Sequence, residues 1–371
     1  MRSTTLATLG VAATTVAAAP SYVMYFDQWH TAKLPDKTVT AGVTHVITAF
    51  ATSDTFNSGS SYTPFMPLDQ VRALFDDGTK VCMAIGGWGD TSGFSAGSAT
   101  EETRKTYAQN VADTLERLGY DCVDIDWEYP GGNGSDYKQI PNDQKVQEID
   151  NYPLFLSEIK AAIGDKELSI AVPGREGDMI AFTAEKVPEI DGIVDHVNVM
   201  TYDLMNRRDN VTNHHTGIEG SLKSIDLYIE RGMTPSKMIL GFAFYAKWFT
   251  TKDGADCPEP LDCPTAELEA PDGTDTGLSG AVTFEEASYT NADFVFALEN
   301  SQTDEKRGGE WFWDSAKFVF WTWDNPELIA RKFDEIVKPK GLGGVMAWSL
   351  AQDSHDWSHF KAMAEGVKGM A

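Results

Sequence analysis

The chain has 371 residues, of which 42% are hydrophobic, and this is enough to bury one large core. Its formal net charge of −26 at pH 7 argues against nucleic acids and anionic membrane surfaces as partners, because both repel an acidic protein. The acidity suits an uncharged or cationic polymer as substrate, and it can equally serve solubility alone.

The first residues have the features of a secretory signal peptide. Arg2 supplies a short positive end, residues 6–16 form a small apolar run, and a row of alanines leads to Ala19. Such a segment is too short for a membrane span and is removed on secretion. We therefore expect a signal peptide over residues 1–19, one folded unit over residues 20–371, and a secreted, extracellular protein with no membrane anchor.

Eight apolar, strand-like runs alternate with helical patterns along the rest of the chain. The helical patterns have proper ends, such as Leu118 before Gly119, and Asn325 followed by Pro326 at a helix start. Eight such units predict an α/β fold, a (β/α)8 TIM barrel, with a doubly wound open sheet as the alternative. The expected strands cover residues 22–26, 43–50, 80–86, 121–127, 167–173, 194–202, 238–245 and 342–349.

One interval is longer than a barrel helix requires. The seventh strand ends near Phe249 and the eighth begins near Leu342. Residues 250–313 in this interval are polar and rich in Gly, Pro, Asp and Glu, with aromatic residues from Tyr289 onward. This pattern predicts a small inserted subdomain between strand seven and helix seven, standing on the face of the barrel where the strands end.

The four cysteines fall into two kinds of sequence context. Cys257 and Cys263 bracket a short, turn-rich loop, which predicts a local disulfide. Cys82 and Cys122 lie in apolar strand segments and are expected to be buried thiols.

A row of acidic residues lies on the fourth expected strand. Because side chains alternate along a strand, Asp124, Asp126 and Glu128 share one face, while the residues between them are apolar. Such a row resists desolvation unless its charges are shared, paired or used in chemistry. A solvated strand face, or oxygen ligands for a hard metal ion, are alternative interpretations of the row by itself.

Glycoside hydrolysis is the chemistry that this spacing fits. The reaction needs a carboxylic acid that keeps its proton near neutral pH, and a carboxylate two residues earlier raises the proton affinity of Glu128. Asp124 and Asp126 can in turn share a proton and titrate jointly. The complete pattern Asp-x-x-Asp-x-Asp-x-Glu, from Asp121 to Glu128, resembles the signature of glycoside hydrolase family 18, the chitinases. Some members of that family carry an α+β insertion after strand seven.

Two further segments compare with family motifs. Strand six ends Met200-Thr201-Tyr202-Asp203, similar to the family's Met-x-Tyr-Asp, and this implies that Tyr202 holds the substrate's acetamide carbonyl. Strand three departs from the family's Ser-x-Gly-Gly, because Ala84 replaces the serine. A hydroxyl that could support the acidic row is therefore absent, and we expect a tuned Asp124 proton without loss of activity.

Several residues at strand ends resemble sugar contacts of the family, although a single aromatic residue is more often part of a core. Aromatic faces stack on the apolar faces of pyranose rings. Trp29 and Trp248 are expected as further walls of the sugar-binding site. The expected substrate-binding residues are Tyr25, Phe50, Trp88, Met200, Asp203, Tyr245 and Trp348.

The resemblance implies a secreted chitinase that hydrolyses β-1,4-linked N-acetylglucosamine polymers with retention, by substrate-assisted catalysis. Glu128 acts as acid and then base, Asp126 orients the acetamide, and Asp124 relays the proton. The expected partners are chitin and chitooligosaccharides, bound by a monomer without cofactor or metal; the seven histidines are scattered without zinc spacing. An endo-β-N-acetylglucosaminidase acting on N-glycans and a non-catalytic chitin-binding lectin remain alternatives, and endo or exo cleavage stays open.

Overall fold

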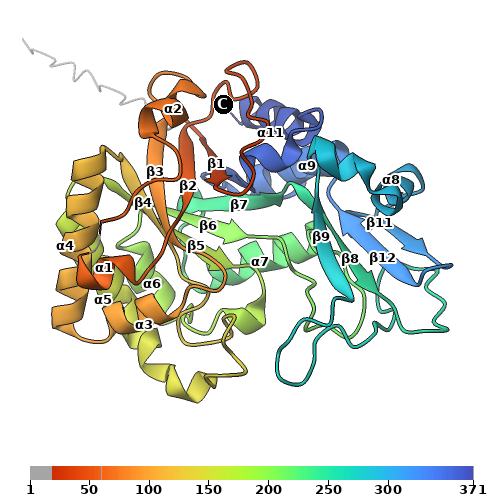
Figure 1. Cartoon of the computed structure of the whole chain (residues 1–371), viewed down its shortest axis with the longest axis horizontal. Coiled ribbons are helices and arrows are strands. Elements are labelled where there is room, and N and C mark those ends of the chain that lie inside the picture. Colours follow the sequence, from red (N-terminus) through yellow and green to blue (C-terminus); the bar gives the residue numbers. More distant parts are fainter. Residues whose placement is uncertain (1–18, 60, 371) are drawn as a thin grey trace, which may run out of the picture.

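The computed structural model describes residues 19–59 and 61–370, so the expected signal peptide, except for residue 19, lies outside the described residues. Eight parallel strands close into a barrel in the order β1-β13-β7-β6-β5-β4-β3-β2 (Figure 1). The predicted TIM barrel is confirmed, and the open-sheet alternative is wrong. The strands are β1 Ser21–Asp27, β2 His45–Ala51, β3 Lys80–Gly86, β4 Cys122–Asp126, β5 Glu167–Pro173, β6 His196–Met200, β7 Met238–Ala243 and β13 Gly344–Trp348.

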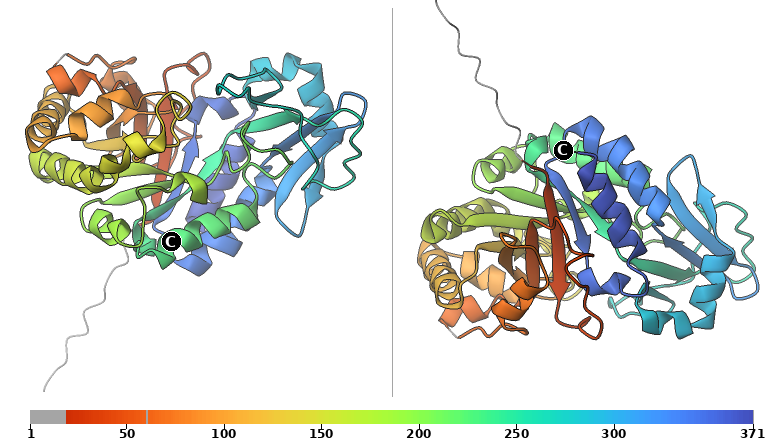
Figure 2. Two further views of the ribbon diagram at one scale, coloured as in Figure 1. Left: turned by 90° about the horizontal axis from the view of Figure 1, so that it is seen from below. Right: turned by 90° about the horizontal axis from the view of Figure 1, so that it is seen from above.

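Helices surround the barrel and cover the outer face of its strands (Figure 2). The predicted start near Asn325 is confirmed, since its side chain accepts a hydrogen bond from the Leu328 amide and Pro326 begins the helix. Within the described ranges, no helix has both the length and the apolar character needed to cross a membrane. The α-helices outside the insertion are α1 Thr55–Ser58, α2 Leu68–Ala73, α3 Ser92–Ser98, α4 Glu101–Leu118, α5 Val146–Ile163, α6 Lys186–Asp191, α7 Ile218–Glu230, α9 Pro326–Lys332, α10 Lys338–Lys340 and α11 Ser358–Lys368, with a π-helix over Phe333–Val337.

The alternation along β4 separates two apolar layers, as predicted. Val123, Ile125 and Trp127 point outward into the core between strands and helices. Cys122 points inward, into a smaller apolar cluster inside the barrel. The polar members of the row therefore reach the barrel interior, where β4 ends.

A second, antiparallel sheet stands beside the barrel, in the order β10-β11-β12-β8-β9 (Figure 1). Apolar clusters cover both of its faces, one around Trp321 and Phe294 and the other around Phe249 and Phe320. The sheet runs from Tyr245 to Trp323, so the expected limits of 250 and 313 fall inside it. Its elements are β8 Tyr245–Thr250, β9 Ser279–Thr283, α8 Ala292–Glu299, β10 Gln302–Asp304, β11 Gly309–Asp314 and β12 Val319–Trp323.

The structure corrects one of the two cysteine predictions. Cys257 and Cys263 form the expected local disulfide. Cys82 and Cys122, expected as thiols, also form a disulfide, with their Cα atoms 4.4 Å apart. The reason is register: β3 pairs with β4 so that Cys82 lies directly opposite Cys122, on the inward faces of both strands. The sequence of each strand by itself does not show which residues of the neighbouring strand lie opposite, so this disulfide was not predicted.

Candidate active site

A cleft of about 650 Å³ opens where the barrel strands end, between the barrel and the second sheet. The carboxyl ends of parallel strands meet at this edge, so residues far apart in the chain gather there. The cleft is lined by most of the residues that the sequence predicted for the site: Tyr25, Phe50, Trp88, Asp126, Glu128, Met200, Tyr202, Asp203, Tyr245 and Trp348, together with Trp29.

Asp124 lies beneath this cleft and is fully buried. Tyr25 donates to its Oδ2 at 2.8 Å, and Ser169 and Asn198 donate to its Oδ1 at 2.6 and 3.0 Å. Burial raises the pKa of Asp124, although these three hydrogen bonds oppose the shift. The hydroxyl that Ala84 lacks is supplied from the other neighbouring strand, because Asp124 pairs with Ala84 on β3 and with Ser169 on β5.

Asp126 is also buried, and it has an unsatisfied oxygen. Its Oδ1 has no hydrogen-bond partner within the described residues. Burial, and then repulsion from Glu128 and Asp124, raise the pKa of Asp126 well above its usual range. A buried oxygen without a partner is costly, so an N–H donor from a bound molecule would stabilise this side chain.

Glu128 follows β4 and is half-buried at the cleft wall. Burial raises the pKa of Glu128 to about 7, and the charges of Asp203 and Asp178 add to the rise. The Tyr129 hydroxyl donates to Oε2 at 3.0 Å and opposes this rise, because the hydrogen bond favours the charged form. The pKa is raised as predicted, but the causes are burial and the charges of Asp203 and Asp178, in place of the repulsion between row neighbours on which the prediction rested. A carboxyl that keeps its proton at neutral pH suits a general acid.

Tyr202 and Asp203 follow β6 on the other side of the cleft. The Tyr202 hydroxyl donates to the Met346 sulfur at 3.8 Å, and because thioether sulfur is a weak acceptor, a carbonyl oxygen would be a better partner. Asp203 Oδ1 accepts from Tyr245 and Lys247 at 3.0 and 2.9 Å. Burial alone would raise the pKa of Asp203, but the charges of Lys247 and His215 and these hydrogen bonds hold it below its usual value.

An aromatic surface forms the side of the cleft contributed by β1, β2 and β13. Phe50 stacks on Trp348 with ring centroids 5.5 Å apart and an interplanar angle of 19°, and Tyr25 lies 5.7 Å from Trp348. Trp29 and Trp88 leave 62% and 50% of their surface exposed, which is unusual for tryptophan outside a binding surface.

The prediction for Trp248 is wrong. Alternation along β8 directs Tyr245 and Lys247 into the cleft, and it directs Ala246 and Trp248 into the apolar cluster of the second sheet. Trp248 packs there against Trp321, with centroids 6.4 Å apart.

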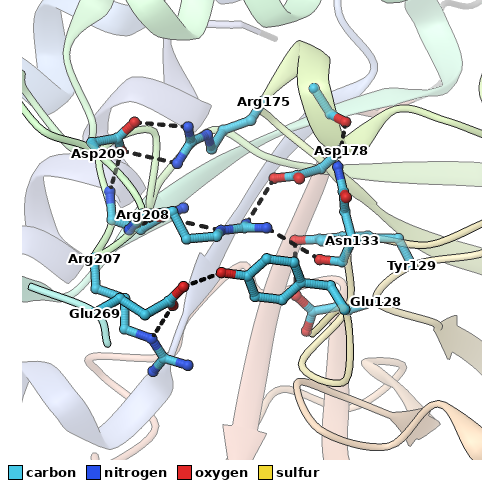
Figure 3. A network of polar contacts seen from close by, with 12 residues as sticks. Glu128, Tyr129, Asn133, Arg175, Asp178, Arg207, Arg208, Asp209 and Glu269 are labelled. Carbon is cyan, nitrogen blue, oxygen red and sulfur yellow. Dashed lines mark hydrogen bonds and ion pairs between the residues drawn. The ribbon is translucent and has the colours of Figure 1, made fainter. Parts of the chain in front are cut away.

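Sequence reasoning missed several residues of the site. Ser169 and Asn198, which hold Asp124, stand out in the sequence only as polar residues within otherwise apolar strands. The cleft wall beside Glu128 also contains Tyr137, Arg175, Arg207, Arg208 and Glu269. Glu269 bonds to Tyr137 and Arg207, while Arg175 pairs with Asp209 and Arg208 pairs with Asp178 (Figure 3). No local pattern marks these five residues, since they come from loops after β4, β5 and β6 and from the insertion.

A second polar cluster fills the opposite mouth of the barrel. Ligand-type atoms of His45, Glu167 and His196 lie within 4.8 Å of one another. Here Glu167 is paired with His45, at 2.9 Å between Oε2 and Nε2, and with the Lys80 ammonium on its other oxygen. The cluster is remote from the cleft, and its carboxylate has cationic and histidine partners from the protein itself.

Comparison with known proteins identifies the family. The family model of Glycosyl hydrolases family 18 matches residues 21–353. Among curated relatives, sporulation-specific chitinase 2 of Saccharomyces cerevisiae is 26% identical over 330 residues, covering 81% of this chain and 61% of the yeast protein. Chitinase A1 of Niallia circulans is 28% identical over 319 residues, covering 77% of this chain and 42% of the bacterial protein. The chain thus spans less than two thirds of either relative.

Solved structures share the fold across almost the whole chain. The second catalytic domain of the Group II chitinase of Ostrinia furnacalis has a TM-score of 0.74 at 21% identity, covering 95% of this chain and 97% of the insect domain. A chitinase of Rhizomucor miehei has a TM-score of 0.74 at 19% identity, covering 93% of this chain and 99% of the fungal one.

Proposed function

The chain belongs to glycosyl hydrolases family 18, and from this we propose that it is a secreted chitinase that hydrolyses β-1,4-linked N-acetylglucosamine with retention of anomeric configuration. The curated relatives named above are chitinases, which supports chitin and its oligosaccharides as substrates. Secretion is supported by the signal-like segment over residues 1–19 and by two disulfides, which are typical of oxidising compartments. The substrate is bound by a monomer.

The observation that carries the mechanism is the buried, unpartnered Oδ1 of Asp126 beside Glu128. In a chitin chain, the sugar before the scissile bond carries an acetamide group. Its N–H satisfies Asp126, while the Tyr202 hydroxyl donates to its carbonyl oxygen in place of the Met346 sulfur. These two contacts hold the carbonyl in line with the anomeric carbon and replace a protein nucleophile.

A residue of the cleft then assists each step of the proposed reaction. The acetamide oxygen attacks the anomeric carbon while Glu128 gives its proton to the leaving glycosidic oxygen, so one bond forms as the other breaks. Asp126 stabilises the positive charge of the resulting oxazolinium ion, and Asp124 shares the row's protons with it. The ionised Glu128 next takes a proton from water, which attacks the anomeric carbon from the vacated side; the bond to the acetamide oxygen breaks, so the acetamide is regenerated and the original configuration is restored.

Product analysis of Glu128→Gln and the wild type tests this function. We expect wild type to cleave N-acetylglucosamine hexamer into products that are initially the β-anomer, observed by NMR. Glu128→Gln should lower kcat about 100-fold or more while still binding the hexamer, because the amide keeps the shape and loses the proton. Glu102→Gln, at an exposed position on α4, is the matched control and should behave as wild type.

Two outcomes would overturn the proposal. Hexamer binding without cleavage by wild type would identify a lectin. Release of glycans from a high-mannose glycoprotein, with no cleavage of the hexamer, would identify an endo-β-N-acetylglucosaminidase.

A further inference from the structure

Two loops meet at the rim of the cleft, far from each other in the chain. One is the loop after β4, residues 129–145, and the other is the insertion loop between β8 and β9, residues 251–278. The Tyr137 hydroxyl donates to Glu269 Oε1, and Gln139 Nε2 donates to the Asp272 carbonyl at 3.4 Å. Lys138 packs so closely on Gly273 that a Cβ there would lie 2.8 Å from Lys138 Cγ. We call this contact, formed by residues 137–139 and 269–273, the strap.

A layer of arginines ties the strap to the barrel (Figure 3). Arg207 Nε lies 2.9 Å from Glu269 Oε2, while the Tyr137 hydroxyl donates to Oε1, so both carboxylate oxygens of Glu269 have partners. The Glu269 side chain is only 9% exposed. Arg208 lies over the Tyr137 ring, 5.4 Å from its centroid, and pairs with Asp178 at 3.2 Å.

The layer is anchored further by Arg175, which forms two hydrogen bonds of 2.9 Å with Asp209. Paired planar contacts of this kind restrict both side chains. Loops after β4, β5 and β6 and the insertion are therefore cross-linked into one wall.

The wall stands on the leaving-group side of the cleft, provided that the proposed function is correct. Strands β4, β5 and β6 lie across the barrel from β1 and β13, which carry the aromatic residues Tyr25 and Trp348. The acetamide-bearing sugar occupies the centre, over Asp126. Glu128 protonates the leaving oxygen, and its carboxyl feels the charges of Asp178 and Asp203, from the loops after β5 and β6. The leaving group beside Glu128 thus extends toward the strap, because Glu128 and Tyr137 both follow β4 and Tyr137 contacts Glu269.

We propose that the strap closes the leaving-group side of the cleft, so that the protein removes short fragments from the reducing end of its substrate. The leaving group of a chitin chain contains the reducing end, since the bond is cut between the anomeric carbon of one sugar and the oxygen of the next. A closed wall accepts a short leaving group and excludes a long one. Sugars on the other side of the cut face the exposed Trp29 and are not limited in this way.

The test follows a label at the reducing end. N-acetylglucosamine hexamer carrying ¹⁸O at its reducing-end hydroxyl is digested briefly, and mass spectrometry determines the length of each product and whether it carries the label. We expect the wild type to place most of the label in the shortest products. The double variant Tyr137→Ala/Glu269→Ala should lower the ratio of label in short to label in long products at least about fivefold, as cuts move inward.

Matched variants distinguish the effect of losing the strap contact from a general loss of folding. Glu267→Ala removes an exposed carboxylate two residues before Glu269 and should keep the wild-type label ratio. Tyr137→Phe removes only the hydroxyl and should give an intermediate ratio, which provides a readout even where the double variant unfolds. Thermal unfolding of each variant is measured in parallel.

The outcomes are distinguishable. Label spread over long and short products by wild type, with no response to either strap variant, would overturn the strap while the hydrolase stands. Absence of any cleavage by wild type would overturn the proposed function and the strap's role together.

Discussion

At the scale of single residues, the pKa of Glu128 depends on burial and on charges from other loops of the cleft, more than on the other carboxylates of the acidic row. Burial raises the pKa of Glu128 to about 7, and the Tyr129 hydroxyl, which favours the charged form, opposes that rise. Glu128, as the proposed general acid, works only while protonated, so activity should be present below about pH 7 and should fall as the pH rises through this pKa.

Tyr129→Phe is expected to move this alkaline limit upward. Removing the hydroxyl withdraws a hydrogen bond that stabilises the Glu128 carboxylate, so the carboxyl holds its proton to higher pH, by roughly half to one pH unit. The measurement is the pH profile of kcat/KM on a chitooligosaccharide. Tyr289→Phe, in the insertion and away from the cleft, serves as the control. A downward shift would contradict this account of the proton.

At the scale of elements, the pairing of β4 with β3 on one side and with β5 on the other determines the surroundings of the acidic row. The register sets Cys82 opposite Cys122 and places Ala84 and Ser169 on either side of Asp124. The Cys82–Cys122 disulfide inside the barrel joins residues 40 positions apart in the chain, whereas the Cys257–Cys263 disulfide in the insertion joins residues 6 positions apart. A longer closed loop removes more entropy from the unfolded chain.

Removing the two disulfides should therefore destabilise the protein unequally. Cys82→Ala/Cys122→Ala is expected to lower the free energy of unfolding by about 4 kcal/mol, and Cys257→Ala/Cys263→Ala by about 2 kcal/mol, from loop entropy alone. Urea unfolding followed by tryptophan fluorescence measures both. Equal losses, or a larger loss for the insertion pair, would show that loop closure does not govern their contributions.

At the scale of the whole molecule, a buried ion pair joins the insertion to the barrel. Asp324 follows β12, where the chain leaves the second sheet, and Lys332 lies on α9; both side chains are fully buried, with Nζ 2.5 Å from Oδ2. Lys332 Nζ also donates to the Thr216 hydroxyl at 2.9 Å, and His359 Nε2 lies 2.9 Å from the Asp324 carbonyl oxygen. One polar cluster thus contacts the loop after β6, the end of the second sheet and two barrel helices.

Lys332→Met is expected to lower the free energy of unfolding by about 3–5 kcal/mol, because it leaves a buried carboxylate without its partner. The surface pair of Lys105 and Glu101 on α4 is the matched comparison, and Lys105→Met should leave the free energy of unfolding nearly unchanged, because water screens exposed charges. Chemical unfolding of both variants gives the two values. A loss at Lys332 no greater than that at Lys105 would mean that the buried pair does not hold the insertion in place.

Local periodicity determined much of this protein. The alternation of Asp124, Asp126 and Glu128 with Val123, Ile125 and Trp127 predicted the inward row and the outward core, because a strand turns its side chains by half a revolution per residue whatever packs against it. Eight repeated strand–helix patterns predicted the barrel, because eight such units in a chain of this size are typical of a (β/α)8 fold. The resemblance to family motifs singled out Tyr202, Tyr245 and Trp348, and the barrel explains why they gather, since its strand ends meet at one edge.

Tertiary structure alone decided the remaining features. The Cys82–Cys122 bond and the Ser169 hydroxyl on Asp124 depend on register between strands, which no single strand encodes. The turn of Trp248 away from the cleft depends on which face of β8 the second sheet buries. Tyr137 and Glu269 meet although they are 132 residues apart in the chain. Such contacts are set by how separately formed elements pack, so sequence predicted the row and its chemistry, while packing shaped the cleft around it.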